Sequence, residues 1–464
     1  MPDDRPWPAT RELARRISST RTEDVDAPAR AKAREAIVDT LGVALAGAKE
    51  ECARIARRLA DREGGTSCSR VWGAGGRTSP SWAAFVNGTA GHALDFDDTD
   101  FIMLGHPSVV LSPALIALAE ERGYGGDEIL AAYAVGFETI RALGRALNPR
   151  HYRRGFHATA TLGTVGAAAA CARLLGLDEG RARHALSLAA SEAAGLGCNF
   201  GTMTKPFHAG QASRAGAVAA LMAEMGFTSG PDALETGYTA ALAAEGIGPG
   251  AERFADWEGA VRSWGPPWDI LEGVNVKLHP CCAMTHTAID AMIELCEREG
   301  VRAGEVEAMG AKSSPMALKI LRYPFARTGL EGKFSMPFCL ASAVADGRVS
   351  IPQFEEGRVR RPEVEALQRR VSFELDPGLA RDDPESHRAE VWVRLKDGRE
   401  VRRLETRPKG HIERPISANE LREKFMECAA AVLARAQAEA AWDGWWELEK
   451  ARDLGELTRL LQPA

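Results

Sequence analysis

The chain has 464 residues, of which 45% are apolar and 26% are charged, a composition that fits a globular protein and excludes a disordered or collagen-like chain. Its 58 basic and 64 acidic residues leave a formal charge of -6, so there is no basic excess to follow a nucleic-acid backbone or an anionic membrane. We therefore expect no nucleic-acid or membrane partner, and a small polar molecule as substrate.

The beginning of the chain, MPDDRPWPATRELARR, is charged and contains proline, and no apolar region with a small-residue cleavage site follows it. No apolar run has the length of about 18 residues that a membrane-spanning helix needs. The nine cysteines are an odd number without the dense spacing of a secreted disulfide scaffold, which predicts mostly reduced thiols. These features predict a cytoplasmic protein.

Up to about residue 245, Ala-rich segments with apolar residues at helical spacing follow one another. In the segment 31–48, Ile37, Leu41 and Leu45 are four apart, and Asp26 precedes it as a candidate N-cap. Because many side chains are small, neighbouring helices can approach closely. The other segments predicted as helices are 111–119, 127–147, 158–175, 179–194 and 212–225.

After about residue 270 the pattern changes to that of strands. Segments 306–314 and 390–404 show alternation and β-branched residues, and the pair Asp397-Gly398 fits a two-residue hairpin turn. Ser417 then begins a capping-box sequence that predicts a helix over 420–438, with further helix over 440–461. If this tail packs on the first helices, the mixed unit is an insertion whose two connections could act as a hinge.

The densest polar cluster is the acidic segment 95–100, which His106 follows closely. On a helix, Asp95 and Thr99 would share a face, with Asp98 beside them. A solvated acidic helix end is the simplest alternative, and a cation site without the EF-hand pattern is another. The segment also matches the D-x-D-x-T pattern of haloacid-dehalogenase-like phosphotransferases, but that pattern needs a buried strand before it, which 87–94 does not resemble.

Two further segments carry single polar residues in apolar or neutral surroundings. His157 precedes an Ala/Gly-rich helix, whose dipole favours the neutral imidazole, a form suited to hydrogen bonding with a substrate carboxyl group; a purely structural histidine is the alternative. Lys205 is the only cation in the Gly-rich turn before Pro206, in a chain with 11 lysines and 47 arginines. Its ammonium group could hold a carboxylate, or it could be an ordinary loop lysine.

The segment 275–286 contains Lys277, two histidines and the pair Cys281-Cys282, without a zinc signature. An iron–sulfur site would need additional cysteines from positions 198, 296 or 339. The segment around Tyr323, together with 328–337, could reach over a cleft if the mixed unit closes, or could be a structural loop.

Taken in order, these segments resemble the MmgE/PrpD family, which includes 2-methylcitrate dehydratases, cis-aconitate decarboxylases and iminodisuccinate epimerases. The resemblance covers nearly the whole chain. The matching motifs are GTAGHALDFDDT (88–99), His106-Pro107-Ser108, GFHAT (155–159), TKPFHAG (204–210), KLHPCC (277–282) and KFSMP (333–337).

The resemblance implies a mainly α fold: a large helical domain over 1–270 and 415–464, and a smaller α+β lid domain over 271–414 inserted before the C-terminal helices. It also implies a homodimer and a site between the two domains that uses no metal and no cofactor. The site residues implied are Asp95, Thr99, His106, His157, Lys205 and Lys277, with Tyr323 as a looser match. Cis-aconitate decarboxylases have a histidine where this chain has Cys282, and the Cys-Cys form resembles the dehydratase-like branch more closely.

Such a site would make or quench a carbanion beside a carboxylate, which nearby cations stabilise. Lys205 and Lys277 would hold the substrate carboxylate, with Thr99, His157 and Cys282 also in contact with the substrate. His106 would transfer the proton at carbon, and Asp95 would tune it.

A dehydratase also needs an acid for the leaving hydroxyl, either His157 or Tyr323. We therefore expect a cofactor-free hydro-lyase of the 2-methylcitrate dehydratase type, acting on a di- or tricarboxylate. An epimerase, a decarboxylase or a non-catalytic helical scaffold are the alternatives.

Overall fold

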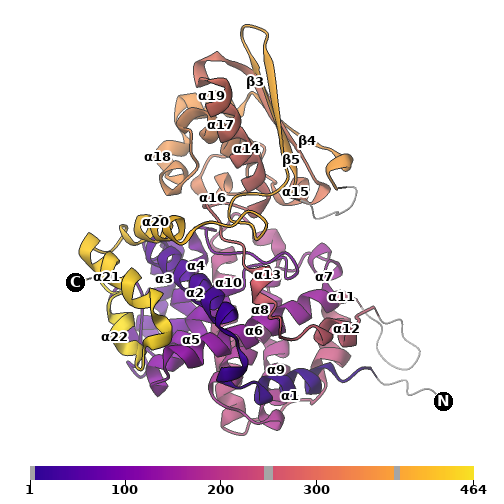
Figure 1. Cartoon of the computed structure of the whole chain (residues 1–464), viewed down its shortest axis with the longest axis vertical. Coiled ribbons are helices and arrows are strands. Elements are labelled where there is room, and N and C mark those ends of the chain that lie inside the picture. Colours follow the sequence, from indigo (N-terminus) through magenta and orange to yellow (C-terminus); the bar gives the residue numbers. More distant parts are fainter. Residues whose placement is uncertain (1–5, 245–253, 381–386, 464) are drawn as a thin grey trace, which may run out of the picture.

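The computed structural model describes residues 6–244, 254–380 and 387–463. It has two parts along its long axis, a large helical body and a smaller part that contains a sheet (Figure 1). None of the described helices combines the length and the apolar character that crossing a bilayer requires.

The body contains the N-terminal helices, one small two-stranded sheet and the C-terminal helices. Its helices are α1 (Ala9–Ser19), α2 (Ala27–Gly47), α3 (Glu51–Glu63), α4 (Pro80–Ala93), α5 (Ser108–Arg122), α6 (Gly126–Leu147), α7 (Arg150–Arg153), α8 (Ala158–Leu174), α9 (Glu179–Glu192), α10 (Thr204–Glu224), α11 (Thr239–Ala243), α12 (Trp257–Arg262), α13 (Ile270–Gly273), α20 (Ala418–Ala429), α21 (Arg435–Trp446) and α22 (Leu454–Arg459). Its strands are β1 (Ser69–Arg70) and β2 (Arg77–Thr78), and its short helical turns are η1 (Thr22–Asp24), η2 (Gly197–Asn199), η3 (Leu234–Tyr238) and η7 (Leu448–Lys450).

The smaller part packs helices against a four-stranded sheet. Its helices are α14 (Ala283–Glu299), α15 (Pro315–Ile320), α16 (Gly329–Gly332), α17 (Met336–Asp346), α18 (Glu356–Val359) and α19 (Pro362–Gln368), with short turns η4 (Ala303–Glu305), η5 (Ile351–Phe354) and η6 (Pro377–Ala380). Its strands are β3 (Val306–Ser313), β4 (Val371–Leu375), β5 (Ala389–Leu395) and β6 (Glu400–Glu405).

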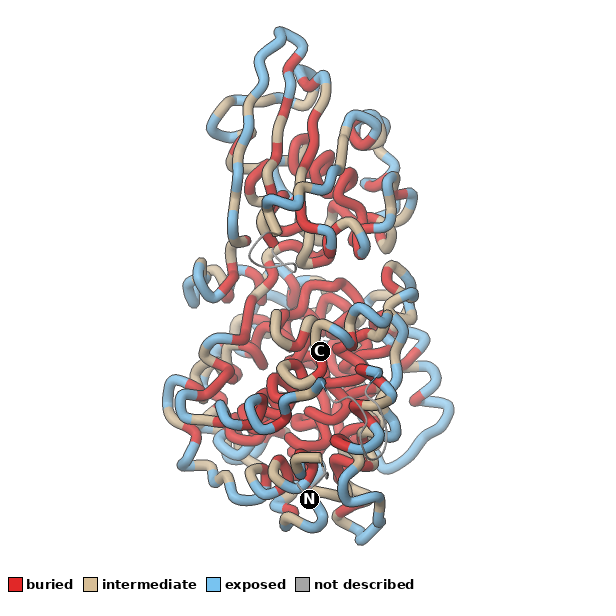
Figure 2. The backbone as a smooth tube through the Cα atoms, turned by 90° about the vertical axis from the view of Figure 1, so that its right-hand side faces the viewer, coloured by how far each residue is buried: buried red, intermediate tan, exposed pale blue. Residues whose placement is uncertain are grey.

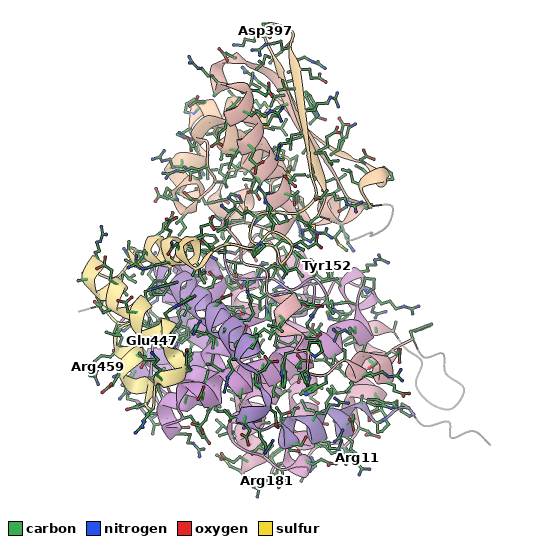
Figure 3. All side chains as sticks on the ribbon, in the orientation of Figure 1. Arg11, Tyr152, Arg181, Asp397, Glu447 and Arg459 are labelled. Carbon is green, nitrogen blue, oxygen red and sulfur yellow. The ribbon has the colours of Figure 1, made fainter. Side chains whose placement is uncertain are left out.

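The strand order is β4-β3-β5-β6, with β3 and β4 parallel and the other neighbours antiparallel. The predicted hairpin is confirmed, since β5 and β6 pair across the turn at Asp397, at the far tip of the molecule (Figure 3). Its turn is longer than the two residues predicted: the N–H of Leu395 donates to the carbonyl of Arg399, which leaves residues 396–398 between them. Val391, Val393 and Leu395 are buried because alternate residues of β5 face the helices. The mainly α fold class is likewise confirmed.

Each part has its own hydrophobic core, visible as buried backbone in both halves of Figure 2. In the body, α4 and α10 approach closely because Gly210 faces α4. A Cβ atom on Gly210 would overlap Thr89 Oγ1 and the carbonyl oxygen of Phe85. This contact fixes the helix that carries Lys205 against the helix that carries His92.

The C-terminal helices pack on the body beside α2 (Figure 1). Lys424 Nζ of α20 lies 2.6 Å from Asp39 Oδ1 of α2, and both side chains are buried. These contacts support our proposal that 415–464 completes the helical domain and that 271–414 is an insertion.

Two sequence predictions about helix boundaries are wrong. The helix predicted from residue 212 begins at Thr204, because Pro206 lies in the first turn, where its missing N–H costs no hydrogen bond. Lys205 therefore lies in a helix and not in a turn. The helix predicted over 420–438 is two helices, with a turn that lets Phe425 of α20 pack against Trp442 of α21 at 5.6 Å between ring centroids.

Candidate active site

A pocket lies where the two parts meet, near Tyr152, which Figure 3 labels at this junction. Both parts contribute side chains to it. The body provides Asp95, Thr99, Asp100, Phe101, Leu104, Gly105, His106, Tyr152, His157, Phe200 and Lys205, and the smaller part provides Cys282, Ala283, Met284, Met316, Ile320, Phe334 and His387.

The acidic segment is a buried turn, so both the shared helix face and the solvated helix end expected from the sequence are wrong. Helix α4 ends at Ala93, and Asp95 has a φ of 53°, a conformation that Asp adopts more readily than most residues. Thr99 then pairs with Asn275 through two backbone hydrogen bonds of 2.9 and 3.0 Å. The chain thus turns the Asp95 carboxylate inward and joins Thr99 to the strand-like segment that leads to Lys277.

Lys205 and Lys277 converge on one carboxylate. Their Nζ atoms lie 3.1 Å and 2.6 Å from Asp95 Oδ1, and Lys277 also donates to the backbone carbonyls of Asp95 (2.8 Å) and Cys281 (2.9 Å). Burial raises the pKa of Asp95, but the two ammonium groups outweigh it and hold that pKa well below its ordinary value. The carboxylate is therefore ionised and fixes both cations at the pocket.

His92 is a site residue to which the sequence analysis assigned no role. Its Nδ1 lies 2.8 Å from Asp97 Oδ2, and its Nε2 lies 2.8 Å from Lys205 Nζ. Burial lowers the pKa of His92 to about 3, so the neutral ring donates to Asp97 and accepts from Lys205. Both His92 and Asp97 belong to the motif 88–99, but nothing in the sequence indicates which of its acids turn inward.

His106 lies between two carboxylates. Its Nδ1 is 3.2 Å from Asp97 Oδ2, and its Nε2 is 3.6 Å from Asp95 Oδ1. Burial lowers the pKa of His106, and although Asp97 raises it, Lys205 and Lys277 keep it below 6.5. The ring is thus neutral at pH 7 and able to take a proton, after which both carboxylates stabilise the imidazolium. Asp97 lies closer to His106 than Asp95, the partner predicted for it.

His157 precedes α8, as the sequence predicts, and its ring lines the pocket. Its Nδ1 lies 3.0 Å from Nδ1 of His208, a residue of α10, so one of the two nitrogens must carry the shared proton. Burial, followed by Lys205, holds the pKa of His157 well below its ordinary value. Like His92, His208 belongs to a family motif and had no assigned role.

Cys282 lines the pocket, whereas Tyr323 is not among the described residues that line it. The Tyr323 ring lies against Gly201, where a Cβ atom would be 2.8 Å from its hydroxyl oxygen. The role of Tyr323 stays a prediction, and the tyrosine that lines the pocket is Tyr152. Burial raises the pKa of Cys282 to about 12, so its thiol is neutral.

A third lysine lies beside this cluster. Lys333 Nζ donates to the carbonyl oxygens of Leu94 (2.7 Å) and Pro280 (2.8 Å), and it is buried. Burial lowers the pKa of Lys333 to about 8. Its ammonium group therefore connects the turn before Asp95 to the turn after Lys277.

Four of these groups have atoms that could act as metal ligands. One atom each from His92, Asp95, Asp97 and His106 lies within 4.8 Å of the others. The ammonium group of Lys205 faces two of the four residues, His92 and Asp95. The neutral ring of His106 lies beside the ammonium groups of Lys205 and Lys277. The ring can remove a proton from carbon, and the two cations can stabilise the negative charge that results.

Comparison with known proteins finds relatives of this chain over nearly its whole length. The family model for the MmgE/PrpD N-terminal domain matches residues 11–246, and that for the MmgE/PrpD C-terminal domain matches residues 279–448. A cis-aconitate decarboxylase from Homo sapiens is 30% identical over 449 residues, covering 93% of this chain and 90% of that protein. A cis-aconitate decarboxylase from Aspergillus terreus is 25% identical over 472 residues, covering 97% and 95%. The chain therefore belongs to the MmgE/PrpD family.

Proposed function

We propose that this enzyme is a lyase that acts on a di- or tricarboxylate by proton transfer at a carbon next to a carboxylate, as a hydro-lyase of the 2-methylcitrate dehydratase type. The observation that carries the proposal is the position of His106. It is a neutral imidazole beside two ammonium groups that Asp95 holds together. Such a site lowers the free energy of a carbanion next to a carboxylate, because positive charge already faces the oxygens that gain electrons.

In the proposed reaction the substrate carboxylate faces Lys205, and His106 Nε2 removes the proton from the adjacent carbon. The electron pair of that C–H bond forms the new double bond, and the hydroxyl on the next carbon leaves as water with the proton that His106 has taken up. The products are the unsaturated acid and water. Neutral His157, whose Nδ1 is hydrogen-bonded to His208, would donate a hydrogen bond from Nε2 to that hydroxyl.

Decarboxylation is the second candidate, because the relatives described above are cis-aconitate decarboxylases. The carbanion would then form by loss of carbon dioxide and would take up a proton from water through His106. The dehydratase is preferred because Cys282, a neutral thiol, lines the pocket where the sequence resemblance places a histidine in decarboxylases.

Proton NMR in deuterium oxide separates the two reactions. The protein would be incubated with 2-methylcitrate, cis-aconitate and a 2-alkylmalate, with the His106→Ala variant as control. An unsaturated product with retention of all carboxylates supports the hydro-lyase, and release of carbon dioxide supports the decarboxylase. If none of these acids reacts or exchanges a C–H proton for deuterium, the proposal is wrong.

A further inference from the structure

The four lysines that are buried in the described structure all bond to one short turn, residues 94–96. One of them, Lys205, reaches the carboxylate of Asp95. The other three donate to three consecutive backbone carbonyl oxygens, with these distances from Nζ to oxygen: Lys333 to Leu94 at 2.7 Å, Lys277 to Asp95 at 2.8 Å and Lys424 to Phe96 at 2.8 Å. The backbone of the turn that carries Asp95 is thus held by three separate ammonium groups.

The turn cannot satisfy these carbonyl groups by itself. Helix α4 ends at Ala93 with Leu94 as its C-cap, so the carbonyl groups of residues 94–96 have no partner in a following turn of helix. All three residues are buried, and a buried carbonyl group without a hydrogen bond costs free energy. Asp95 also has a φ of 53°, in a region that is sparsely populated by residues other than glycine. The conformation that directs Asp95 inward therefore depends on the surrounding donors.

The three donors come from distant parts of the chain. Lys277 lies in the segment that leads into the smaller part, Lys333 follows α16 of the smaller part, and Lys424 lies on α20 among the C-terminal helices. Figure 1 shows α16 and α20 on opposite sides of the junction between the two parts. The turn therefore has all its donors only when the smaller part and the C-terminal helices are both packed on the N-terminal helices.

Lys424 is itself directed by a second buried group. Its Nζ lies 2.6 Å from Asp39 Oδ1 of α2 and 4.1 Å from the centre of the Phe96 ring. Such a pair loses its hydration on burial, and an apolar pair in the same place is often as stable or more stable. Fold stability is thus a weak reason for a buried ammonium group here, whereas its bond to the carbonyl oxygen of Phe96 gives it a specific task.

We propose that Lys333 and Lys424 are positioning residues, which act on the reaction through the turn 94–96 and do not touch the substrate. Neither is among the described residues that line the pocket. By holding the carbonyl groups before and after that of Asp95, they keep its carboxylate against the two lysines of the site. This inference rests on the proposed function for the role of those two lysines. It adds that the smaller part completes the charged side of the site when it packs on the body.

Lys333→Met tests the contribution of the smaller part. Methionine keeps an apolar stem but cannot donate to the carbonyl oxygen of Leu94. Since a displacement of about 1 Å can cost about 100-fold in rate, kcat for the acid that reacts in the NMR experiment should fall at least about tenfold. The matched control is Lys319→Met, because Lys319 also donates from the smaller part to a body carbonyl, that of Arg153 at 3.2 Å, but at an exposed position. Its kcat should stay within about twofold of wild type, and equal kcat of the two variants would overturn the proposal.

Lys424→Met alone leaves Asp39 buried without its cation, so a fall in kcat could reflect a less stable fold. The double variant Asp39→Asn/Lys424→Met removes both charges and should recover most of the lost stability in urea unfolding. Its kcat should nevertheless stay at least about tenfold below wild type, because the carbonyl group of Phe96 still lacks its donor. If kcat returns to the wild-type value together with the stability, Lys424 has only a structural role and the proposal is wrong.

A crystal structure of Lys333→Met gives a measurement that needs no turnover. In it, the backbone at Asp95 should leave the left-handed region, or Lys205 should lose its hydrogen bond to the Asp95 carboxylate. A turn that keeps both features would overturn the inference, even if the variant reacts slowly. Because this structure is decisive whether or not any of the tested acids reacts, the inference and the proposed function can fail separately.

Discussion

The two sides of the pocket are built on different physical principles. On the body side, each ionisable group has a fixed partner: Asp95 holds two lysines, Asp97 holds His92, and His106 lies between both carboxylates. On the other side, Met284 of α14 and the residues Met316 and Ile320 of α15 form an apolar wall, whose contacts have no required direction.

This difference separates the residues that carry out the reaction from the residues that select the substrate. Buried charges are stable only with their partners in place, so a change on the body side disturbs several groups at once. Apolar contacts are roughly additive in buried area, so one wall residue can change without moving the charged groups. We expect body-side variants to lower kcat and wall variants to change KM.

The largest expected effect is that of His106→Ala, which removes the proposed base. General acid–base catalysis contributes roughly 100 to 10,000-fold, so kcat should fall by at least about 100-fold. Calorimetric unfolding should show a fold that remains intact, because Asp97 keeps its contact with His92. The matched control is Met284→Leu, which conserves volume on the wall and should leave kcat close to wild type. If His106→Ala turns over at a near-normal rate, His106 is not the base, and the proton transfer does not take place on the body side of the pocket.

The next effect concerns the packing that holds the charged side together. Gly210→Ala forces a Cβ atom against α4 and should lower the free energy of unfolding by about 1–3 kcal/mol. Urea unfolding measures this loss. Gly357→Ala is the control, since a Cβ atom there meets nothing within 4 Å, and in helix α18 it should stabilise slightly or not at all. Equal stability of the two variants would show that the α4–α10 contact does not constrain the site.

The pH profile tests the charges themselves. Burial holds the pKa of His106 below 6.5, so the neutral base persists into mildly acidic solution, and kcat/KM should fall about tenfold per pH unit only once the pH drops below that pKa. Burial also lowers the pKa of Lys205 below 10.5, and loss of its ammonium charge should produce an alkaline limb below that pH. Because Asp97 raises the pKa of His106, Asp97→Asn should move the acidic limb to still lower pH. An acidic limb above pH 6.5 would contradict this electrostatic arrangement.

Much of the fold could be predicted because the signals are local. The N-cap Asp26, the strand alternation over Val306–Ser313 and the turn at Asp397 each depend on neighbouring residues, and all three are confirmed. The break between α20 and α21 could not be predicted in this way. It depends on tertiary packing of Phe425 against Trp442, which outweighs the high helix propensity of the alanines between them.

The residues of the site could be predicted from sequence motifs, but their arrangement in space could not. The structure brings Asp95, His106, His157, Lys205 and Lys277 to one place, but the roles proposed for them remain to be tested. The contacts of His92 and His208 depend on how α4, α8 and α10 pack, which no spacing in the sequence encodes. The position of Asp97 depends on the left-handed backbone at Asp95, which a helical reading of the segment misses.

The smallest expected effect is that of a substitution on the wall. It tests whether substrate binding can be changed without changing the rate of the reaction. Met284→Ala removes part of the apolar surface that would cover the bound substrate, a loss of about 1 kcal/mol, or roughly fivefold in KM. Because Met284 is uncharged and has no part in the proposed proton transfer, kcat should stay within about twofold of wild type. Steady-state kinetics with the acid that reacts in the NMR experiment measures both constants. A fall in kcat with unchanged KM would mean that the wall stabilises the transition state. Substrate selection and the reaction would then not be separated between the two sides of the pocket.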